Sequence, residues 1–173
     1  MAVGERMMNA RLGDEIINHW TYVMASDGDL MEGVSQEAIS LAGHLCLNKL
    51  IVLFDDNEIT IDGSTRLSTS DDHLKRFQAS GWNAWRIDGH NHDEIHEALS
   101  RAQSSDKPSL IACRTTIAKG SPNKAGTSAS HGSPLGSDEV VATREFLKWH
   151  HHLPFVTPEP ILQAWRKIGE RHQ

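Results

Sequence analysis

The first two thirds of the chain alternate short apolar runs with amphipathic stretches, and this alternation restricts the fold more than any other feature. Runs typical of β-strands occupy residues 21–25, 50–54, 84–87 and 110–113. Stretches with helical spacing of apolar residues separate these runs. Strands that alternate with helices are typical of β-α-β units, whose parallel strands are joined by right-handed crossovers. The sequence therefore predicts an α/β fold, with a four-stranded parallel β-sheet and helices on both of its faces.

Three helices are predicted between these strands from caps and apolar spacing. Ser35 is expected to cap the first helix. Its predicted buried face consists of Ala38, Leu41, Ala42 and Leu45. Asp71 or Asp72 is expected to begin the second helix, which ends at Ala79. The third helix has the most regular spacing, and its predicted buried face consists of Ile95, Ala98, Leu99 and Ala102.

The last third of the chain has a different composition. Residues 117–137 are rich in Gly, Ser, Pro, Asn, Lys and Thr, as is typical of a binding loop or a disordered segment. Ser137 is expected to cap a helix that extends to Lys148. A last helix is predicted to end near Arg171. It is preceded by Pro154, Pro158 and Pro160.

Charge and hydropathy exclude several classes of partner. The 173 residues include 17 Lys and Arg against 23 Asp and Glu, which gives a net charge of −6. The chain therefore lacks the basic stripe that nucleic acid or an anionic membrane would need. No window approaches the ~18 consecutive apolar residues of a membrane span, and no export signal opens the chain. We expect a cytoplasmic protein that binds neither nucleic acid nor a membrane.

The cysteines and a run of histidines are expected to carry no chemistry. Cys46 and Cys113 lie inside apolar runs, where a thiol packs as a small hydrophobic group. His150, His151 and His152 are consecutive and cannot share one helical face, so solvent-exposed histidines are expected in place of a metal site.

Oxygen donors follow the first two predicted strands. Asp27, Gly28 and Asp29 come after the first strand, and residues 55–63 after the second. In a parallel sheet, ligands bind outside the carboxyl ends of the strands, so these two loops are expected to converge. Hard oxygen ligands suit Mg²⁺ or Ca²⁺. The alternative is that both segments are ordinary turns, since Asp-Gly pairs are common there.

These residues resemble the thiamine diphosphate signature of transketolases, in which a Gly-Asp-Gly triplet is followed, after a helix and a strand, by an asparagine. Asp27 and Asn57 match the aspartate and the asparagine. Further segments similar to the family are 29–38, 40–44, 55–63, 120–127 and 130–136. The resemblance extends from about Ala2 to the final helix. It implies that residues 1–136 form a diphosphate-binding domain, incomplete at its N-terminus, and that residues 137–173 form a helical extension of it.

The resemblance also implies the ligands of the cofactor. Asp27 and Asn57 match the side-chain ligands of a divalent cation, Mg²⁺ or Ca²⁺, and Ile59 matches a ligand through its backbone carbonyl. Gly28 matches the position where the backbone approaches the diphosphate. Ile61 matches part of the apolar wall beside the thiazolium ring.

Three further residues match family positions with functional roles. His131 matches a histidine beside cofactor and substrate, where it would donate a hydrogen bond and transfer a proton; the alternative is a loop histidine in water. Glu32 and Glu37 match acidic residues near a subunit interface, where glutamates connect the paired sites through hydrogen-bonded water. Glu32 is therefore expected, with His131, among the catalytic residues. The alternative for these glutamates is a pair of charges favoured by the dipole at a helix N-terminus.

The activity implied is the thiamine diphosphate-dependent transfer of a two-carbon ketol unit from a ketose phosphate to an aldose phosphate, within the pentose phosphate pathway. The pyrimidine-binding domain that this chemistry needs does not match any part of the chain. We therefore expect a diphosphate-binding portion that acts in a homodimer or with a partner subunit carrying that domain.

A non-catalytic remnant of the fold, acting as an interaction domain, is the second hypothesis. Ser26 replaces the first glycine of the signature, and Asp29 adds a carboxylate beside the expected diphosphate. A glycine-only backbone angle at residue 26, or repulsion by Asp29, would weaken cofactor binding. A nicotinamide-binding domain is disfavoured because no G-x-G-x-x-G follows a strand.

Overall fold

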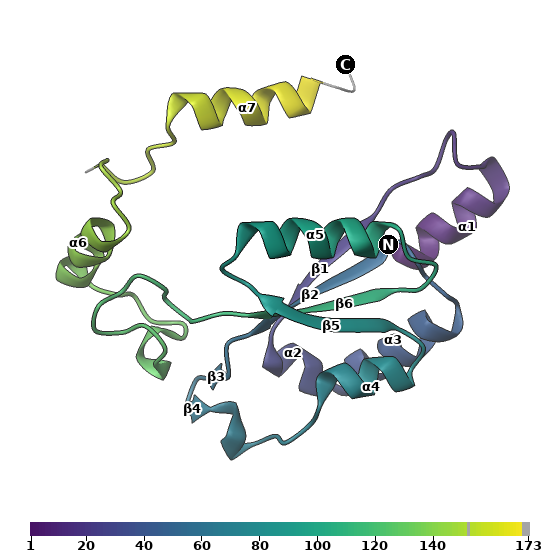
Figure 1. The fold of residues 1–173 in the computed structure, drawn as a ribbon, viewed down its shortest axis with the longest axis horizontal. Helices are drawn as coiled ribbons and strands as arrows, with labels where there is room; N and C mark the ends of the chain where they lie inside the picture. Colours follow the sequence, from purple (N-terminus) through teal and green to yellow (C-terminus); the bar gives the residue numbers. More distant parts are fainter. Residues whose placement is uncertain (152, 171–173) are drawn as a thin grey trace. The chain divides into compact units, whose positions relative to one another are not determined.

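The computed structural model describes residues 1–151 and 153–170. Its main sheet has four parallel strands in the order β1-β2-β6-β5. These strands are β1 (Thr21–Ala25), β2 (Leu50–Asp56), β5 (Asn83–Asp88) and β6 (Ser109–Arg114). Figure 1 shows helices on both faces of this sheet. The predicted α/β fold with a parallel sheet is therefore confirmed.

The first face of the sheet carries the larger core. Three helices cover it: α2 (Asp27–Met31), α3 (Gly33–His44) and α4 (His73–Ala79). Val52 and Phe54 of β2 point toward these helices, as alternate residues of a strand do. Phe77 of α4 packs edge to face against Trp82, whose indole nitrogen donates to the Ile39 carbonyl at 2.8 Å. This hydrogen bond joins α3 to the segment that leads into β5.

The second face of the sheet is covered by α5 (His92–Gln103). Ala98 and Ala102 are buried against Ile51 and Ile111, which alternate with the residues of the first core. Of the predicted buried face, Ala98 and Ala102 are buried, Leu99 packs at the margin of this core, and Ile95 is half-buried. Small residues at this contact let the helix lie close to the sheet.

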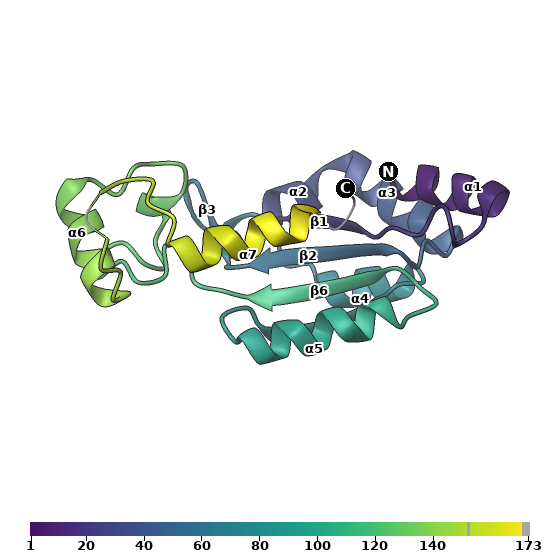
Figure 2. The ribbon, with the colours of Figure 1, turned by 90° about the horizontal axis from the view of Figure 1, so that it is seen from above.

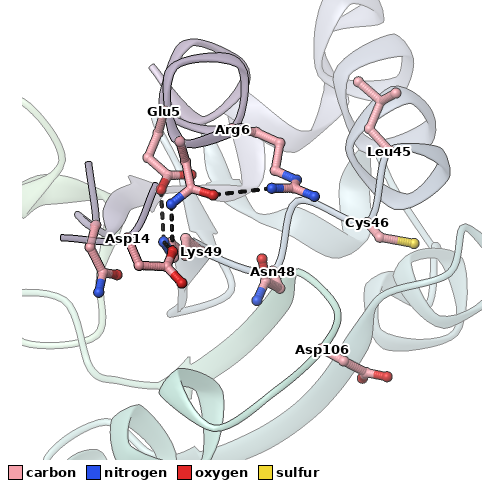
Figure 3. A pocket seen from close by; sticks show the side chains of 10 residues that line it. Glu5, Arg6, Asp14, Leu45, Cys46, Asn48, Lys49 and Asp106 are labelled. Atoms are coloured by element: carbon pink, nitrogen blue, oxygen red, sulfur yellow. Dashed lines mark hydrogen bonds and ion pairs between the residues drawn. The ribbon is translucent and has the colours of Figure 1, made fainter. Parts of the chain in front are cut away.

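An ion pair in a polar pocket joins α1 (Ala2–Leu12) to the amino end of β2. The Glu5 carboxylate is almost fully buried and lies 2.8 Å from the Lys49 ammonium, with Asp14 at 3.8 Å from the same group (Figure 3). The pocket has a volume of about 510 Å³. Figure 2 shows α1 at the end of the sheet opposite the short strand β3 (Ile59–Thr60).

Helix α3 begins at a different residue than predicted and buries a different side. It begins at Gly33, so Ser35 lies inside the first turn, and its hydroxyl donates to the Asp29 carbonyl at 2.6 Å. The buried residues are Ile39, Ala42 and Gly43. Of the predicted face only Ala42 is buried, while Ala38, Leu41 and Leu45 are exposed. The helix carries apolar residues on more than one side, so spacing alone did not select the side that meets the sheet.

Helix α4 begins as predicted, and a small hairpin precedes it. The Asp72 carboxylate accepts from the Lys75 amide at 3.1 Å, which makes Asp72 the N-cap. Residues 55–63, expected as a loop, include β3 (Ile59–Thr60), which pairs antiparallel with β4 (Gly63–Ser64). A 3₁₀ turn, η1 (Thr65–Leu67), follows the hairpin. Strands of two residues are too short for the sequence pattern to reveal.

The described chain divides into two compact units, of which residues 1–119 with 123–135 form the first. A 3₁₀ turn, η2 (Ser128–Ser130), belongs to this unit. The second unit contains residues 120–122 and the described part of 136–173, with helices α6 (Ser137–Phe146) and α7 (Glu159–Gly169). Within this second unit, the Ser121 hydroxyl donates to the Glu139 carboxylate.

Both helices of the second unit depart slightly from their predictions. Gly136, with a φ of 89°, occupies the N-cap position expected for Ser137, which is the first helical residue. Pro160 lies inside the first turn of α7, where its missing N–H costs nothing. The predicted end of the last helix, Arg171, lies outside the described residues.

The two cysteines occupy different environments. Cys113 is half-buried against the second core, and burial raises the pKa of its thiol to about 11. Cys46 is exposed, so its predicted burial is wrong. Its φ of 49° places it in a left-handed turn after α3, which directs the side chain away from the apolar neighbours that suggested burial.

None of the helices within residues 1–151 and 153–170 has the length and apolar character needed to cross a membrane.

Candidate functional site

The predicted oxygen donors lie on elements that meet at the carboxyl end of the sheet. Asp27 is the first residue of α2, two residues after the end of β1. Asn57 directly follows β2, and Ile59 begins β3. Helix α2 contacts both β2 and β3, and Figure 1 shows α2 and β3 at the same end of the sheet. The fold therefore brings the segments carrying these three residues together, although they are distant in sequence.

Asp27 has an unusual environment for a carboxylate. It is only 7% exposed, and no ion pair to it is found in the described part of the chain. Burial, together with the negative charges of Asp56, Asp55 and Glu58, raises the pKa of its carboxyl group to about 6. A buried carboxylate surrounded by other carboxylates is stabilised by a cation, so this position suits a divalent metal ion.

The Asn57 side chain is held in a fixed orientation by its neighbours. Its amide nitrogen donates to the Asp55 carboxylate at 3.0 Å, and its carbonyl oxygen accepts from the Ile59 amide at 2.9 Å. A carbonyl oxygen has two lone pairs, so this oxygen can accept one hydrogen bond and still bind a cation. Between the two residues, Glu58 has a φ of 60°, which turns the backbone sharply before β3.

Ser26 and Asp29, the two residues expected to weaken cofactor binding, are hydrogen-bonded to each other. The φ of Ser26 is −106°, an extended conformation that serine adopts without strain. The Asp29 carboxylate accepts from both the amide and the hydroxyl of Ser26, each at 2.8 Å. These hydrogen bonds hold the pKa of Asp29 below its usual value. The additional carboxylate is therefore engaged in a capping box at the start of α2.

Gly28 and Ile61 are both exposed. A Cβ built on Gly28 would meet no protein atom within 4 Å, so packing within the described chain does not require glycine there. Ile61 is 71% exposed in the turn between β3 and β4. Their expected roles against the diphosphate and the thiazolium ring stay predictions.

The remaining predicted residues lie in three different settings. His131 follows η2 and is partly buried, with its amide donating to the Ser128 carbonyl at 3.0 Å. Glu32 separates α2 from α3, and Glu37 lies on α3; both are exposed. The predicted catalytic and interface roles of these residues stay predictions.

A cluster of ion pairs beside the predicted ligands was not foreseen from the sequence. The Asp56 carboxylate, whose side chain is 8% exposed, lies 3.0 Å from Arg86 and 3.4 Å from Arg114. Arg114 also lies 2.8 Å from Glu58. Asp27, Asp56 and Arg86 line one cavity of about 330 Å³. The sequence shows two consecutive aspartates at 55 and 56 but does not show that arginines lie beside them. Arg86 and Arg114 come close to Asp56 because β2, β6 and β5 are neighbours in the sheet.

The histidine run provides no metal centre among the residues that the structure describes. His150 is exposed as expected. His151 packs edge to face on Trp149, with ring centroids 5.2 Å apart. His152 lies outside the described residues.

Comparison with known families identifies the fold and its ligand class. The family model for the transketolase, thiamine diphosphate binding domain matches residues 1–173. The chain belongs to the transketolase family. The resemblance noted in the sequence is thereby confirmed for the whole chain.

Curated transketolases are similar over nearly the whole of this chain. Identity is 53% over 171 residues to a transketolase of Sinorhizobium medicae, covering 99% of this chain and 24% of that protein. It is 52% to a transketolase of Cereibacter sphaeroides, covering 99% of this chain and 26% of that protein. The chain spans about a quarter of the length of these relatives.

Solved transketolase structures have the same fold. The structure from Campylobacter jejuni has a TM-score of 0.91 and 36% identity, covering 95% of this chain and 26% of that one. The Pichia stipitis transketolase in complex with sedoheptulose 7-phosphate has a TM-score of 0.90 and 34% identity, covering 96% of this chain and 25% of that one. The four-stranded parallel sheet is therefore that of the transketolase thiamine diphosphate-binding domain.

Proposed function

We propose that this transketolase chain is the diphosphate-binding portion of the enzyme, with Asp27, Asn57 and the carbonyl of Ile59 holding Mg²⁺, or Ca²⁺, for thiamine diphosphate. The observation that carries this proposal is the position of Asp27. It is buried near the carboxyl end of β1 and has no ion-pair partner among the described residues. Its helix, α2, contacts both β2, which ends just before Asn57, and β3, which begins at Ile59.

The donor set supports a hard divalent cation. It combines one carboxylate, one amide oxygen and one backbone carbonyl, all of which Mg²⁺ and Ca²⁺ accept. The three acidic groups that act on Asp27 add negative potential at the same place. A diphosphate alone would be repelled by this potential, so a cation between the carboxylates and the phosphates is required.

We assign the other predicted residues to the cofactor and substrate. Gly28 leaves space for the diphosphate, and exposed Ile61 provides an apolar surface for the ring. His131 donates a hydrogen bond and transfers a proton near the substrate, and Glu32 contributes with Glu37 to a contact between subunits. When bound, thiamine diphosphate supplies the chemistry that carries a two-carbon ketol unit.

Solved relatives support the proposed class of substrate. The Pichia stipitis structures include complexes with fructose 6-phosphate, sedoheptulose 7-phosphate and xylulose 5-phosphate. We therefore propose transfer between sugar phosphates of this class, in the cytoplasm, within a homodimer or with a partner subunit that carries the pyrimidine-binding domain. In this assembly, residues 1–136 bind the diphosphate and residues 137–173 extend the same domain.

Thermal unfolding of the 173-residue chain tests cofactor binding directly. A ligand at 100 times its dissociation constant stabilises the folded state by about 2.7 kcal/mol, which raises the Tm of a chain this size by about 5 to 10 °C. Thiamine diphosphate with Mg²⁺ is expected to produce this shift. The chelator EDTA is expected to remove it, and Ca²⁺ to restore it.

Two matched variants separate the site from nonspecific binding. Asp27→Asn keeps the shape of the side chain and removes the charge, so it is expected to abolish the shift. Asp106→Asn removes an exposed carboxylate at the opposite end of the sheet and is expected to leave the shift unchanged. A parent chain with no shift, indistinguishable from Asp27→Asn, would instead support the non-catalytic remnant.

A further inference from the structure

Arg114, the last residue of β6, contacts the loop that carries the proposed cation ligands. It stands opposite Asp56 in the strand register. Its Nη1 donates to the Asp56 carbonyl at 3.1 Å and lies 3.4 Å from the Asp56 carboxylate. Its Nη2 lies 2.8 Å from the Glu58 carboxylate. One guanidinium group therefore contacts the residue before Asn57 and the residue after it.

These two contacts bracket the point where the loop is most constrained. Glu58 has a left-handed backbone, which a residue with a Cβ adopts only at a cost of about 1 kcal/mol or more. After this turn, the Ile59 amide donates to the side-chain carbonyl oxygen of Asn57 at 2.9 Å. The planar, forked guanidinium can hold two acceptors in fixed positions, as the single ammonium of lysine cannot.

We propose that Arg114 is a positioning residue for the cation site, which holds the Glu58 turn so that Asn57 and Ile59 face one ion. Arg114 acts through Asp56 and Glu58 and does not itself touch the cation. The expected effect of Arg114 on cation binding rests on the proposed function. The order that Arg114 imposes on the loop exists without any ligand.

Arg86 provides a matched control within the same cluster. Its Nε lies 3.0 Å from the Asp56 carboxylate, so it neutralises the same charge as Arg114. Among the residues that the structure describes, Arg86 forms an ion pair with Asp56, on one side of Asn57, and none with Glu58. Arg86→Gln and Arg114→Gln therefore remove the same charge near the site. Only Arg114→Gln breaks the link to Glu58.

The sign of the change in cation affinity distinguishes a positioning role of Arg114 from a purely electrostatic one. Removing a positive charge near a cation site makes the local potential more negative and, by Coulomb's law, strengthens cation binding. Arg86→Gln is expected to tighten binding or leave it unchanged. Arg114→Gln is expected to weaken binding, because the disordered loop no longer presents Asn57 and Ile59 together.

Amide hydrogen exchange on the ligand-free 173-residue chain tests the positioning itself. The Ile59 amide donates to Asn57, and the Thr65 amide donates to the Glu58 carbonyl at 3.0 Å. In Arg114→Gln both amides are expected to exchange about tenfold faster, and in Arg86→Gln within about twofold of the parent. The Val52 and Leu53 amides in β2 report global stability and are expected to stay unchanged in both variants.

Mn²⁺ binding in the presence of thiamine diphosphate, followed by electron paramagnetic resonance, tests the consequence. The Kd for Mn²⁺ is expected to rise about tenfold or more in Arg114→Gln, which corresponds to about 1.4 kcal/mol. Equal effects of the two substitutions on exchange and on Kd would overturn the proposal. A parent chain that binds no Mn²⁺ would contradict the proposed function, whereas unchanged exchange at Ile59 in Arg114→Gln would contradict the positioning role alone.

Discussion

At the scale of single residues, the carboxyl end of the sheet gathers buried polar groups whose charges act on one another. Asp27 and Asp56 are both buried, and the Asp56 charge raises the pKa of Asp27. Asp56 has two arginine partners, whereas Asp27 has no ion pair among the described residues. This difference supports the proposal that Asp27 binds an external cation.

His73 lines the same cavity as Asp27 and Asp56. Its environment predicts that the free energy of unfolding depends on pH. Its ring packs edge to face on Phe54 at 5.2 Å, and its buried Nδ1 has no hydrogen-bond partner among the described residues. Burial lowers the pKa of His73 below its ordinary value of 6.5, and the charge of Arg76 lowers it further. The carboxylates that oppose this effect belong to Asp71, Asp56 and Asp72.

The sign of the pH effect follows from these protonation states. As the pH falls below 6.5, the unfolded chain protonates His73 while the folded chain keeps it neutral, so stability decreases until the lower folded pKa is reached. The raised Asp27 pKa of about 6 opposes this loss over the same range, so urea unfolding in an Asp27→Asn background is expected to show it between pH 7.5 and pH 5.5. His73→Gln is expected to reduce it, and His96→Gln, an exposed position on α5, to leave it intact. Identical pH profiles for parent and His73→Gln would contradict this prediction.

At the scale of elements, helix α3 is held close to the turn after α4 by a glycine. A Cβ built on Gly43 would lie 1.7 Å from the Ser80 carbonyl oxygen and 2.9 Å from its carbon, which are backbone atoms that cannot rotate away. The Trp82 hydrogen bond to the Ile39 carbonyl spans the same contact. The packing of α3 against the first core therefore depends on the absence of a side chain at residue 43.

Substitution of Gly43 by alanine tests this contact. Gly43→Ala is expected to destabilise the chain by about 2 to 3 kcal/mol, because α3 must move away from Ser80. Gly33→Ala in the same helix meets no atom within 4 Å and is expected to be neutral or stabilising by up to about 1 kcal/mol. Chemical denaturation of both variants measures the difference. A Gly43→Ala variant as stable as Gly33→Ala would show that the helix is not held at this distance.

At the scale of the whole molecule, both hydrophobic cores lie within one of the two units. Their buried members fall between Ala25 and Ala112, all inside residues 1–119. Helix α7 in the second unit has exposed apolar residues at Ile161, Trp165 and Ile168. The free energy of folding from apolar burial is therefore concentrated in the sheet and its helices.

A truncated chain tests this distribution. A chain ending at Leu135 is expected to keep the parallel sheet and to unfold within about 3 °C of the parent, because no core residue is removed. A chain ending at Lys107 loses β6, which lies between β2 and β5, and is expected to be unfolded. Circular dichroism during heating measures both. Loss of cooperative unfolding in the chain ending at Leu135 would show that the second unit is required for stability.

Much of the architecture could be predicted because it follows from local patterns. The four strands, α5 and the cap at Asp72 each arise from apolar spacing or from a side chain that bonds to its own backbone. The buried side of α3 and the exposure of Cys46 could not be predicted in this way. They depend on which apolar side meets the sheet and on a left-handed turn, and neither is encoded within a few residues.

The sequence alone determined the kind of fold, the family resemblance and the identity of the proposed ligands, since strand periodicity and the Asp27 to Asn57 motif are written along the chain. Only the tertiary structure decided that Asp27 is buried without an ion-pair partner among the described residues, and that Arg114 contacts both sides of Asn57. The physical reason is that burial and charge proximity arise between strands that are neighbours in the sheet and far apart in sequence.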